Sequence, residues 1–249
     1  MRQLLFAANW KMHIGPQDAR DYLATFTKAY AARSDREVWF FPPAVSIAAA
    51  AQAVAQRSDL RVGAQDIHWE PKGAFTGAIS GPLAAQAGAR AVLIGHSERR
   101  HVFGETDADT AKKVRAALAA QLAPMLCVGE TLAEREGRQT IAVVTRQLAA
   151  GLGGLDGATL GGIAVAYEPV WAIGTGKNAT PQDAADVHRR IRAWLVEHRA
   201  ARTRVLYGGS VNLKNIADLL AEVELDGVLV GGASLEADGW VRLVQTAAT

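Results

Sequence analysis

Short apolar runs alternate with longer, partly polar segments along nearly the whole chain. Each apolar run is almost continuously hydrophobic, which is typical of parallel β-strands that are covered on both faces. The strands predicted in this way are residues 3–8, 37–41, 61–64, 91–95, 124–128, 163–167, 204–207 and 227–230.

The longer segments between these runs predict helices. Thr180 and Pro181 have the residue types preferred at the N-cap and the first position of a helix, and Gly88 fits the position after a helix end. The glycine-rich stretch 151–162 is interpreted as a long connection. The predicted helices cover residues 17–32, 44–56, 82–87, 107–121, 140–152, 181 to about 198, 213–220 and 235–245.

Eight strand–helix units in 249 residues give about 31 residues per unit, the size expected for a closed (β/α)8 barrel. A doubly wound open sheet is the alternative, but such a sheet usually has a glycine-rich dinucleotide fingerprint after its first strand. Here Asn9-Trp10-Lys11-Met12-His13 follows the first strand instead. We therefore predict an α/β protein with eight parallel strands, in which residues 1–249 form a single domain.

Composition excludes several other classes of protein. With 49% hydrophobic and 21% charged residues, the chain is not expected to be disordered, and a net charge of +2 does not suit a general binder of nucleic acid or membrane surfaces. The single cysteine, Cys127, excludes a disulfide framework or a cysteine-rich metal site and favours the cytoplasm. We find neither a membrane-spanning run nor a signal-peptide pattern in the sequence.

Candidate chemistry follows the predicted strands, and active sites of such barrels form where the strands end. Pro169 follows Glu168 and fixes it in an extended conformation at the strand end. The Glu168 carboxylate is then either part of an ion pair at the barrel rim or a general base. His96 is either structural or a donor to a developing oxyanion. Asn9 and Lys11 lie two residues apart after the first strand and can point to the same side.

Glycine-rich turns follow the last two predicted strands, at Gly208-Gly209-Ser210 and at Gly231-Gly232-Ala233-Ser234. Either turn alone could be a simple tight connection. Together, after adjacent strands, they favour a phosphate site built from backbone N–H groups, to which a helix starting at Ser234 could add.

The order of these segments resembles the triosephosphate isomerase family over essentially all of residues 1–249. The matching segments are Asn9-Trp10-Lys11-Met12, Gly73-Ala74-Phe75-Thr76-Gly77, Gly95-His96-Ser97-Glu98-Arg99-Arg100, Cys127-Val128-Gly129-Glu130, Tyr167-Glu168-Pro169-Val170-Trp171-Ala172-Ile173-Gly174-Thr175-Gly176, Tyr207-Gly208-Gly209-Ser210-Val211 and Gly231-Gly232-Ala233-Ser234-Leu235. The resemblance implies a TIM barrel that interconverts dihydroxyacetone phosphate and D-glyceraldehyde 3-phosphate through an enediolate, in glycolysis and gluconeogenesis, without metal or other cofactor.

The resemblance also implies roles for individual residues. Glu168 would move a carbon-bound proton, while neutral His96 would polarise the carbonyl and move protons between oxygens. Lys11 and Asn9 would lie near the enediolate and the phosphate, and Glu98 would orient Lys11. Backbone N–H groups near Gly174, Ser210, Gly231 and Gly232 would bind phosphate. The lid would comprise Pro169, Val170, Trp171, Ala172, Ile173, Gly174, Thr175, Gly176 and Lys177, with Tyr207 and Ser210 contacting it when closed.

A last implication is a homodimer, in which a loop with Phe75, Thr76 and Gly77 inserts into the partner. Three positions differ from the commoner family pattern, namely Ala78 in place of an acidic residue and Asp66 and His13 in place of asparagine. Two other functions stay open on the residues alone. A Schiff-base aldolase would use Lys11, and a phosphate-binding sensor would have lost the base or the lid.

Overall fold

The computed structural model describes residues 3–172 and 180–246. Its centre is a closed barrel of parallel strands that neighbour each other in sequence order, with β1 pairing with both β2 and β8. The predicted barrel is therefore confirmed, and the open-sheet alternative is wrong. The strands are β1 (Leu4–Asn9), β2 (Arg36–Phe41), β3 (Leu60–Ala64), β4 (Ala91–Ile94), β5 (Ala123–Val128), β6 (Ala164–Tyr167), β7 (Arg204–Tyr207) and β8 (Gly227–Val230).

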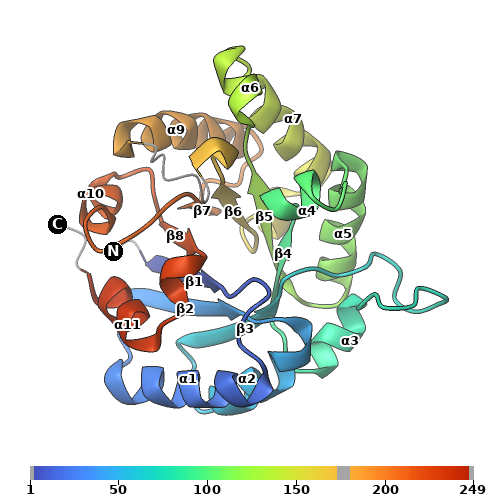
Figure 1. Cartoon of the computed structure of the whole chain (residues 1–249). Helices are drawn as coiled ribbons and strands as arrows, with labels where there is room; N and C mark the ends of the chain where they lie inside the picture. Colours follow the sequence, from blue (N-terminus) through green and yellow to red (C-terminus); the bar gives the residue numbers. More distant parts are fainter. Residues whose placement is uncertain (1–2, 173–179, 247–249) are drawn as a thin grey trace.

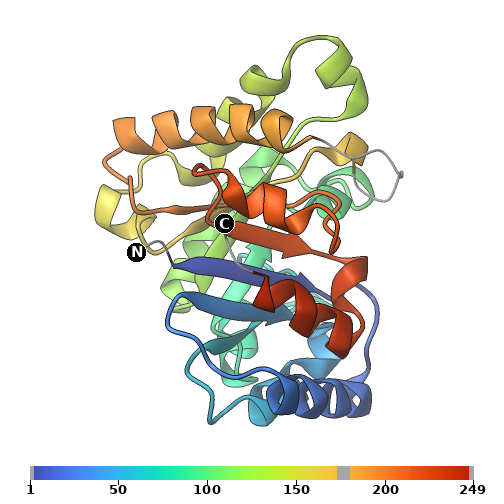
Figure 2. The same ribbon diagram turned by 90° about the vertical axis from the view of Figure 1, so that its left-hand side faces the viewer.

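Helices surround this ring of strands (Figure 1). In the view turned by 90°, α9 and α1 lie on opposite sides of the strands (Figure 2). The α-helices are α1 (Pro16–Ala29), α2 (Ile47–Ala53), α3 (Gly81–Gln86), α4 (Ser97–His101), α5 (Asp107–Ala119), α6 (Leu132–Glu136), α7 (Thr140–Leu152), α8 (Gly157–Leu160), α9 (Pro181–Glu197), α10 (Ile216–Ala221) and α11 (Ala237–Gln245), and the 3-10 turns are η1 (Ala44–Ser46), η2 (Val170–Ala172) and η3 (Gly232–Ser234).

The strands are apolar throughout because both of their faces are buried. Alternate residues point into the barrel, where Ala7, Trp39, Leu93 and Leu206 belong to one packed cluster. The residues between them point outward and join the larger cluster with the helices, as Phe6 does. A two-sided core of this kind leaves polar side chains room only at the strand ends, which is where the candidate site residues lie.

Every predicted strand is present, with ends that agree within one residue, and α7 agrees at both ends. The predicted N-cap of α9 is confirmed, since Thr180 accepts from the Asp183 N–H in a capping box. Several other helix bounds were too generous. Residues 44–56 divide into η1 and α2, and α1 ends at Ala29 because Tyr30 is extended and buried.

Three short helices were not predicted: α4, α6 and α8. Each has four or five residues, which is too short for a helical hydrophobic period to show in the sequence. The helix α8 lies within the stretch that we interpreted as a plain connection. No helix within the described ranges is long and apolar enough to cross a membrane.

Candidate active site

Four of the predicted site residues meet at the carboxyl ends of the strands. Asn9 ends β1, Lys11 follows it, His96 follows β4 and Glu168 follows β6. All four line a cavity of about 460 Å³, together with His13 and the turns after β7 and β8. Chain segments far apart in the sequence thus form one mixed polar pocket.

Glu168 is 2% exposed, and both of its carboxylate oxygens have partners. Oε2 accepts the backbone N–H of Ser97 at 2.8 Å, and Oε1 lies 3.0 Å from Nε2 of His96. The backbone around Glu168 is packed tightly, since a Cβ on Gly129 would lie 1.8 Å from the Glu168 carbonyl oxygen. Position 129 therefore has room only for glycine, and this crowding fixes where the carboxylate enters the cavity.

His96 is held as the N-cap of α4. Its Nδ1 accepts the backbone N–H of Glu98 at 3.2 Å, so the ring proton belongs on Nε2, where it can be donated to Glu168. Burial lowers the pKa of His96, but its interactions with the Glu168 and Glu98 carboxylates together raise the pKa by more, so the net direction is upward. Once Glu168 has taken a proton, its raising effect is lost and the neutral ring is favoured.

Lys11 extends from an uncommon backbone conformation, with φ at 50°. Its backbone N–H donates to Asn9 Oδ1 at 3.0 Å, and its carbonyl accepts from Gln65 Nε2 at 2.7 Å. The Lys11 ammonium pairs with Glu98 Oε1 at 2.6 Å. These contacts fix the Lys11 side chain at the cavity wall, beside the Glu98 carboxylate.

The turns after β7 and β8 face the same cavity. Gly208, Gly209 and Ser210 line one side, and Gly231 and Gly232 line another. Our expectation that Ser234 begins a helix was wrong. Ser234 ends the 3-10 turn η3, its hydroxyl donates to the carbonyls of Val230 and Gly231, and α11 begins only at Ala237.

The start of the predicted lid packs on a buried carboxylate. Pro169, Val170, Trp171 and Ala172 are described, whereas Ile173, Gly174, Thr175, Gly176 and Lys177 lie outside the described residues. Trp171 Nε1 donates to Glu130 Oε1 at 2.9 Å, and the Tyr167 hydroxyl donates to the same carboxylate. Glu130 is fully buried, and its hydrogen bonds connect the end of β6 to η2, where the predicted lid starts.

Tyr207 ends β7, and its buried hydroxyl finds no hydrogen-bond partner within the described ranges. Burial raises the pKa of Tyr207 to about 12, so the hydroxyl keeps its proton at neutral pH and can donate. Sequence reasoning assigned no role to Glu130 or Gln65. Glu130 lies in a motif that we recognised, and Gln65 is the neighbour of Asp66, so both residues were in view. Their roles were missed because their hydrogen-bond partners lie far away in the sequence.

The three positions that differ from the commoner pattern have different surroundings. His13 lines the cavity, although it is exposed. Asp66 accepts from the Lys113 ammonium at 2.5 Å and pairs with Arg99 at 3.1 Å. Ala78 lies in the loop between β3 and α3, where its N–H donates to the Phe75 carbonyl.

Comparisons with known proteins agree with this geometry. The family model described as "Triosephosphate isomerase" matches residues 4–247. A protein named triosephosphate isomerase from Moorella thermoacetica is 51% identical over 247 residues, covering 98% of each chain. A second, from Solibacter usitatus, is 46% identical and covers 98% of this chain and 99% of its own length.

The fold comparison gives the same result. The crystal structure of triosephosphate isomerase from Bartonella henselae superposes with a TM-score of 0.87 at 36% identity, covering 98% of both chains. Sequence, fold and the grouping of Asn9, Lys11, His96 and Glu168 around one cavity agree over nearly the full length. The chain therefore belongs to the triosephosphate isomerase family, whose members interconvert dihydroxyacetone phosphate and D-glyceraldehyde 3-phosphate in glycolysis.

Proposed function

We propose that this isomerisation takes place in the cavity at the carboxyl ends of the strands, with Glu168 as the base and His96 as the acid. The observation that carries the proposal is the buried pair itself, with Glu168 Oε1 at 3.0 Å from His96 Nε2. A carboxylate shielded from water, next to a proton donor, can serve a reaction that moves one proton between carbons and another between oxygens.

Glu168 takes the proton from the carbon beside the carbonyl and returns it to the neighbouring carbon. To do so, it must release the Ser97 N–H or the imidazole and turn an oxygen toward the substrate. His96 gives its Nε2 proton to the carbonyl oxygen and takes a proton from the adjacent hydroxyl group. Both residues finish as they began, so the cycle is balanced without any external reagent.

Lys11 and Asn9 stabilise the charge that develops during this cycle. The Lys11 ammonium lies near the cavity's glycine turns, since a Cβ on Gly231 would be 3.0 Å from its Cε. An ammonium in a partly dry pocket stabilises an enediolate and a phosphate more strongly than it would in water. Glu98 orients this ammonium, and Asn9 Nδ2 lies 3.2 Å from His96 Nε2.

The phosphate group binds to backbone N–H groups near Ser210, Gly231 and Gly232, joined by Gly174 of the lid. Residues 169–177 close over the substrate, exclude water and discourage loss of phosphate from the enediolate. The hydroxyl of Tyr207 supports this part of the proposal, because a buried donor that has no partner among the described residues is costly until one arrives. Tyr207 and Ser210 then contact the closed lid.

We further propose that one domain, residues 1–249, works as a homodimer in the cytoplasm. Large apolar side chains are exposed in the connections between strands and helices, among them Met12 after β1 at 95%, Val45 in η1 at 74% and Phe103 after α4 at 65%. The loop with Phe75, Thr76 and Gly77 projects away from the barrel (Figure 1). His68 stacks on Trp69 and also contacts the Phe75 ring, with centroids 4.4 Å and 4.1 Å away, and these contacts order the loop for insertion into a partner. The single buried thiol of Cys127 suits a reducing compartment.

A coupled assay of triose phosphate interconversion, run without added metal or cofactor, tests these assignments in the full-length protein. Glu168→Gln keeps the size of the side chain and removes the base, so we expect turnover to fall by about 10³-fold while inorganic phosphate still binds. Normal turnover of this variant would refute the base assignment.

His96→Gln is expected to lower turnover mainly through kcat. Specific activity that falls on dilution would support the dimer, and constant activity down to a monomeric species would refute it.

A further inference from the structure

Gly95 connects β4 to His96 and is held at both of its backbone polar groups. Its φ of 69° turns the chain sharply out of the strand. The Gly95 N–H donates to Glu105 Oε1 at 2.9 Å, and its carbonyl accepts from Arg100 Nε at 2.8 Å. Two charged side chains thus fix the peptide groups that immediately precede the imidazole.

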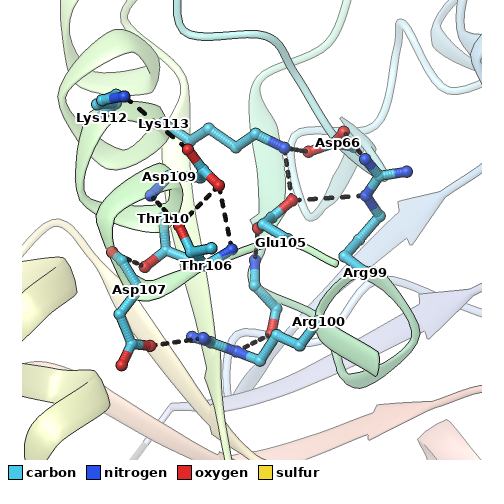
Figure 3. A network of polar contacts seen from close by, with 11 residues as sticks. Asp66, Arg99, Arg100, Glu105, Thr106, Asp107, Asp109, Thr110, Lys112 and Lys113 are labelled. Carbon is cyan, nitrogen blue, oxygen red and sulfur yellow. Dashed lines mark hydrogen bonds and ion pairs between the residues drawn. The ribbon is translucent and has the colours of Figure 1, made fainter. Parts of the chain in front are cut away.

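Arg100 reaches back from α4 and uses all three of its guanidinium nitrogens. Besides the Gly95 carbonyl, it donates through Nη2 to the Cys127 carbonyl at 3.3 Å and through Nη1 to Asp107 Oδ1 at 2.7 Å. Its side chain is only 8% exposed. Arg100 therefore ties the end of β4 to the end of β5, while Asp107 at the start of α5 supplies the opposite charge (Figure 3).

Glu105 is held in turn by a second set of ion pairs. Its Oε2 lies 2.5 Å from the Lys113 ammonium, which also contacts Asp66, and 3.5 Å from Arg99 Nε (Figure 3). Side chains from the β3–α3 loop, α4 and α5 therefore converge beside Gly95. Neither Arg100 nor Glu105 lines the catalytic cavity.

We propose that Arg100 is a positioning residue that holds His96 in register with Glu168; this inference rests on the role of His96 proposed above. A guanidinium can bind two carbonyls and a carboxylate at once because its donors form a rigid planar fork. Arg100 contacts none of the groups proposed to bind substrate, so we expect it to act through the backbone that carries His96. A misplacement of about 1 Å can cost about 10²-fold in rate.

Arg100→Lys tests the proposal because it keeps the charge and loses the fork. We expect kcat to fall about tenfold or more while KM changes by less than about twofold. The matched control is Arg146→Gln, which removes the other cation on Asp107, at 3.0 Å, from an exposed side chain. The control should keep the kcat of the unsubstituted enzyme. An Arg100→Lys enzyme with unchanged kcat would overturn the proposal.

A double-mutant cycle with His96→Gln separates positioning from general loss of structure. If Arg100 acts through His96, adding Arg100→Lys to His96→Gln should lower kcat by less than about twofold further. A full additional loss of about tenfold would overturn the proposal. Full activity of His96→Gln alone would instead refute the proposed acid, so the two failures are distinguishable.

Two further checks keep the test decisive. Sedimentation at the assay concentration shows whether Arg100→Lys alters assembly; a kcat that recovers at higher enzyme concentration would assign the loss to assembly and overturn the proposal. If Arg100→Lys does not fold, Asp107→Asn removes the charge that orients the guanidinium and leaves the Gly95 and Cys127 carbonyls as its acceptors. It should lower kcat in the same direction with unchanged KM, and normal kcat would overturn the proposal.

Discussion

The buried imidazole of His188 makes the stability of this protein depend on pH. His188 lies within α9, is fully buried and packs edge-on against Tyr167, with ring centroids 5.9 Å apart. Its Nδ1 lies 3.4 Å from the Glu224 carbonyl oxygen, and Nε2 lacks a hydrogen-bond partner in the described part of the chain. Burial lowers the pKa of His188 from 6.5 to about 3.

This shift destabilises the fold as the pH decreases. In the unfolded chain the imidazole takes up a proton below about pH 6.5, whereas the folded protein keeps it neutral down to about pH 3. The unfolded state therefore binds more protons across this window, and the free energy of unfolding decreases through it. At pH 5 the solution is about 1.5 pH units below the pKa of the imidazole in the unfolded chain. Protonation of the unfolded state therefore lowers the free energy of unfolding by about 2 kcal/mol relative to pH 8.

His188→Leu isolates this contribution, because leucine fills a similar volume and does not titrate. The free energy of unfolding is measured by urea denaturation at fixed protein concentration, from pH 8 to pH 5. Over this range we expect the substituted protein to gain about 2 kcal/mol of unfolding free energy relative to the unsubstituted protein. His198→Gln is the matched control, since His198 caps the same helix but is exposed. This control shows whether replacing a histidine of α9 by itself changes the pH dependence of the free energy of unfolding.

The carboxylates with lowered pKa values, such as Asp59 and Asp183, also lose stabilising contacts in acid, but they do so equally in all three proteins. Only the difference between the curves reports on His188. Parallel curves for His188→Leu and the unsubstituted protein across this range would refute the reasoning.

Three further predictions concern the active site. Gly129→Ala would put a Cβ 1.8 Å from the Glu168 carbonyl oxygen, so we expect a large loss of both thermal stability and activity, measured by Tm and the coupled assay. Gly232→Ala meets open space, so Tm should stay unchanged while a crowded phosphate site raises KM; an unchanged KM would argue against phosphate at this turn. Trp171→Phe removes the 2.9 Å bond to Glu130 and should lower kcat by loosening the base of the lid, which steady-state kinetics with Tm as control would detect.

Much of the fold could be predicted from local pattern alone. The continuous apolar runs gave all eight strands because burial on both faces demands apolar residues at every position. The N-cap of α9 could also be predicted, because a cap is a local contact between residues close in the sequence, here Thr180 and Asp183. Short elements such as α4 were not predictable, because five residues show no period and their stability comes from tertiary contacts.

For the candidate site, too, part could be predicted from the sequence and part is set only by the tertiary structure. The sequence by itself determined which side chains follow the strand ends, since a parallel barrel brings those ends together, and it supplied the motifs that match the family. Only the tertiary structure decided that Glu168 lies 3.0 Å from His96, that Glu130 accepts a hydrogen bond from Trp171, and that Arg100 and Glu105 hold Gly95. The Glu168, Glu130 and Arg100–Cys127 contacts join strands or loops separated by tens of residues. Their distances depend on how the closed barrel packs as a whole, which no local stretch of sequence records.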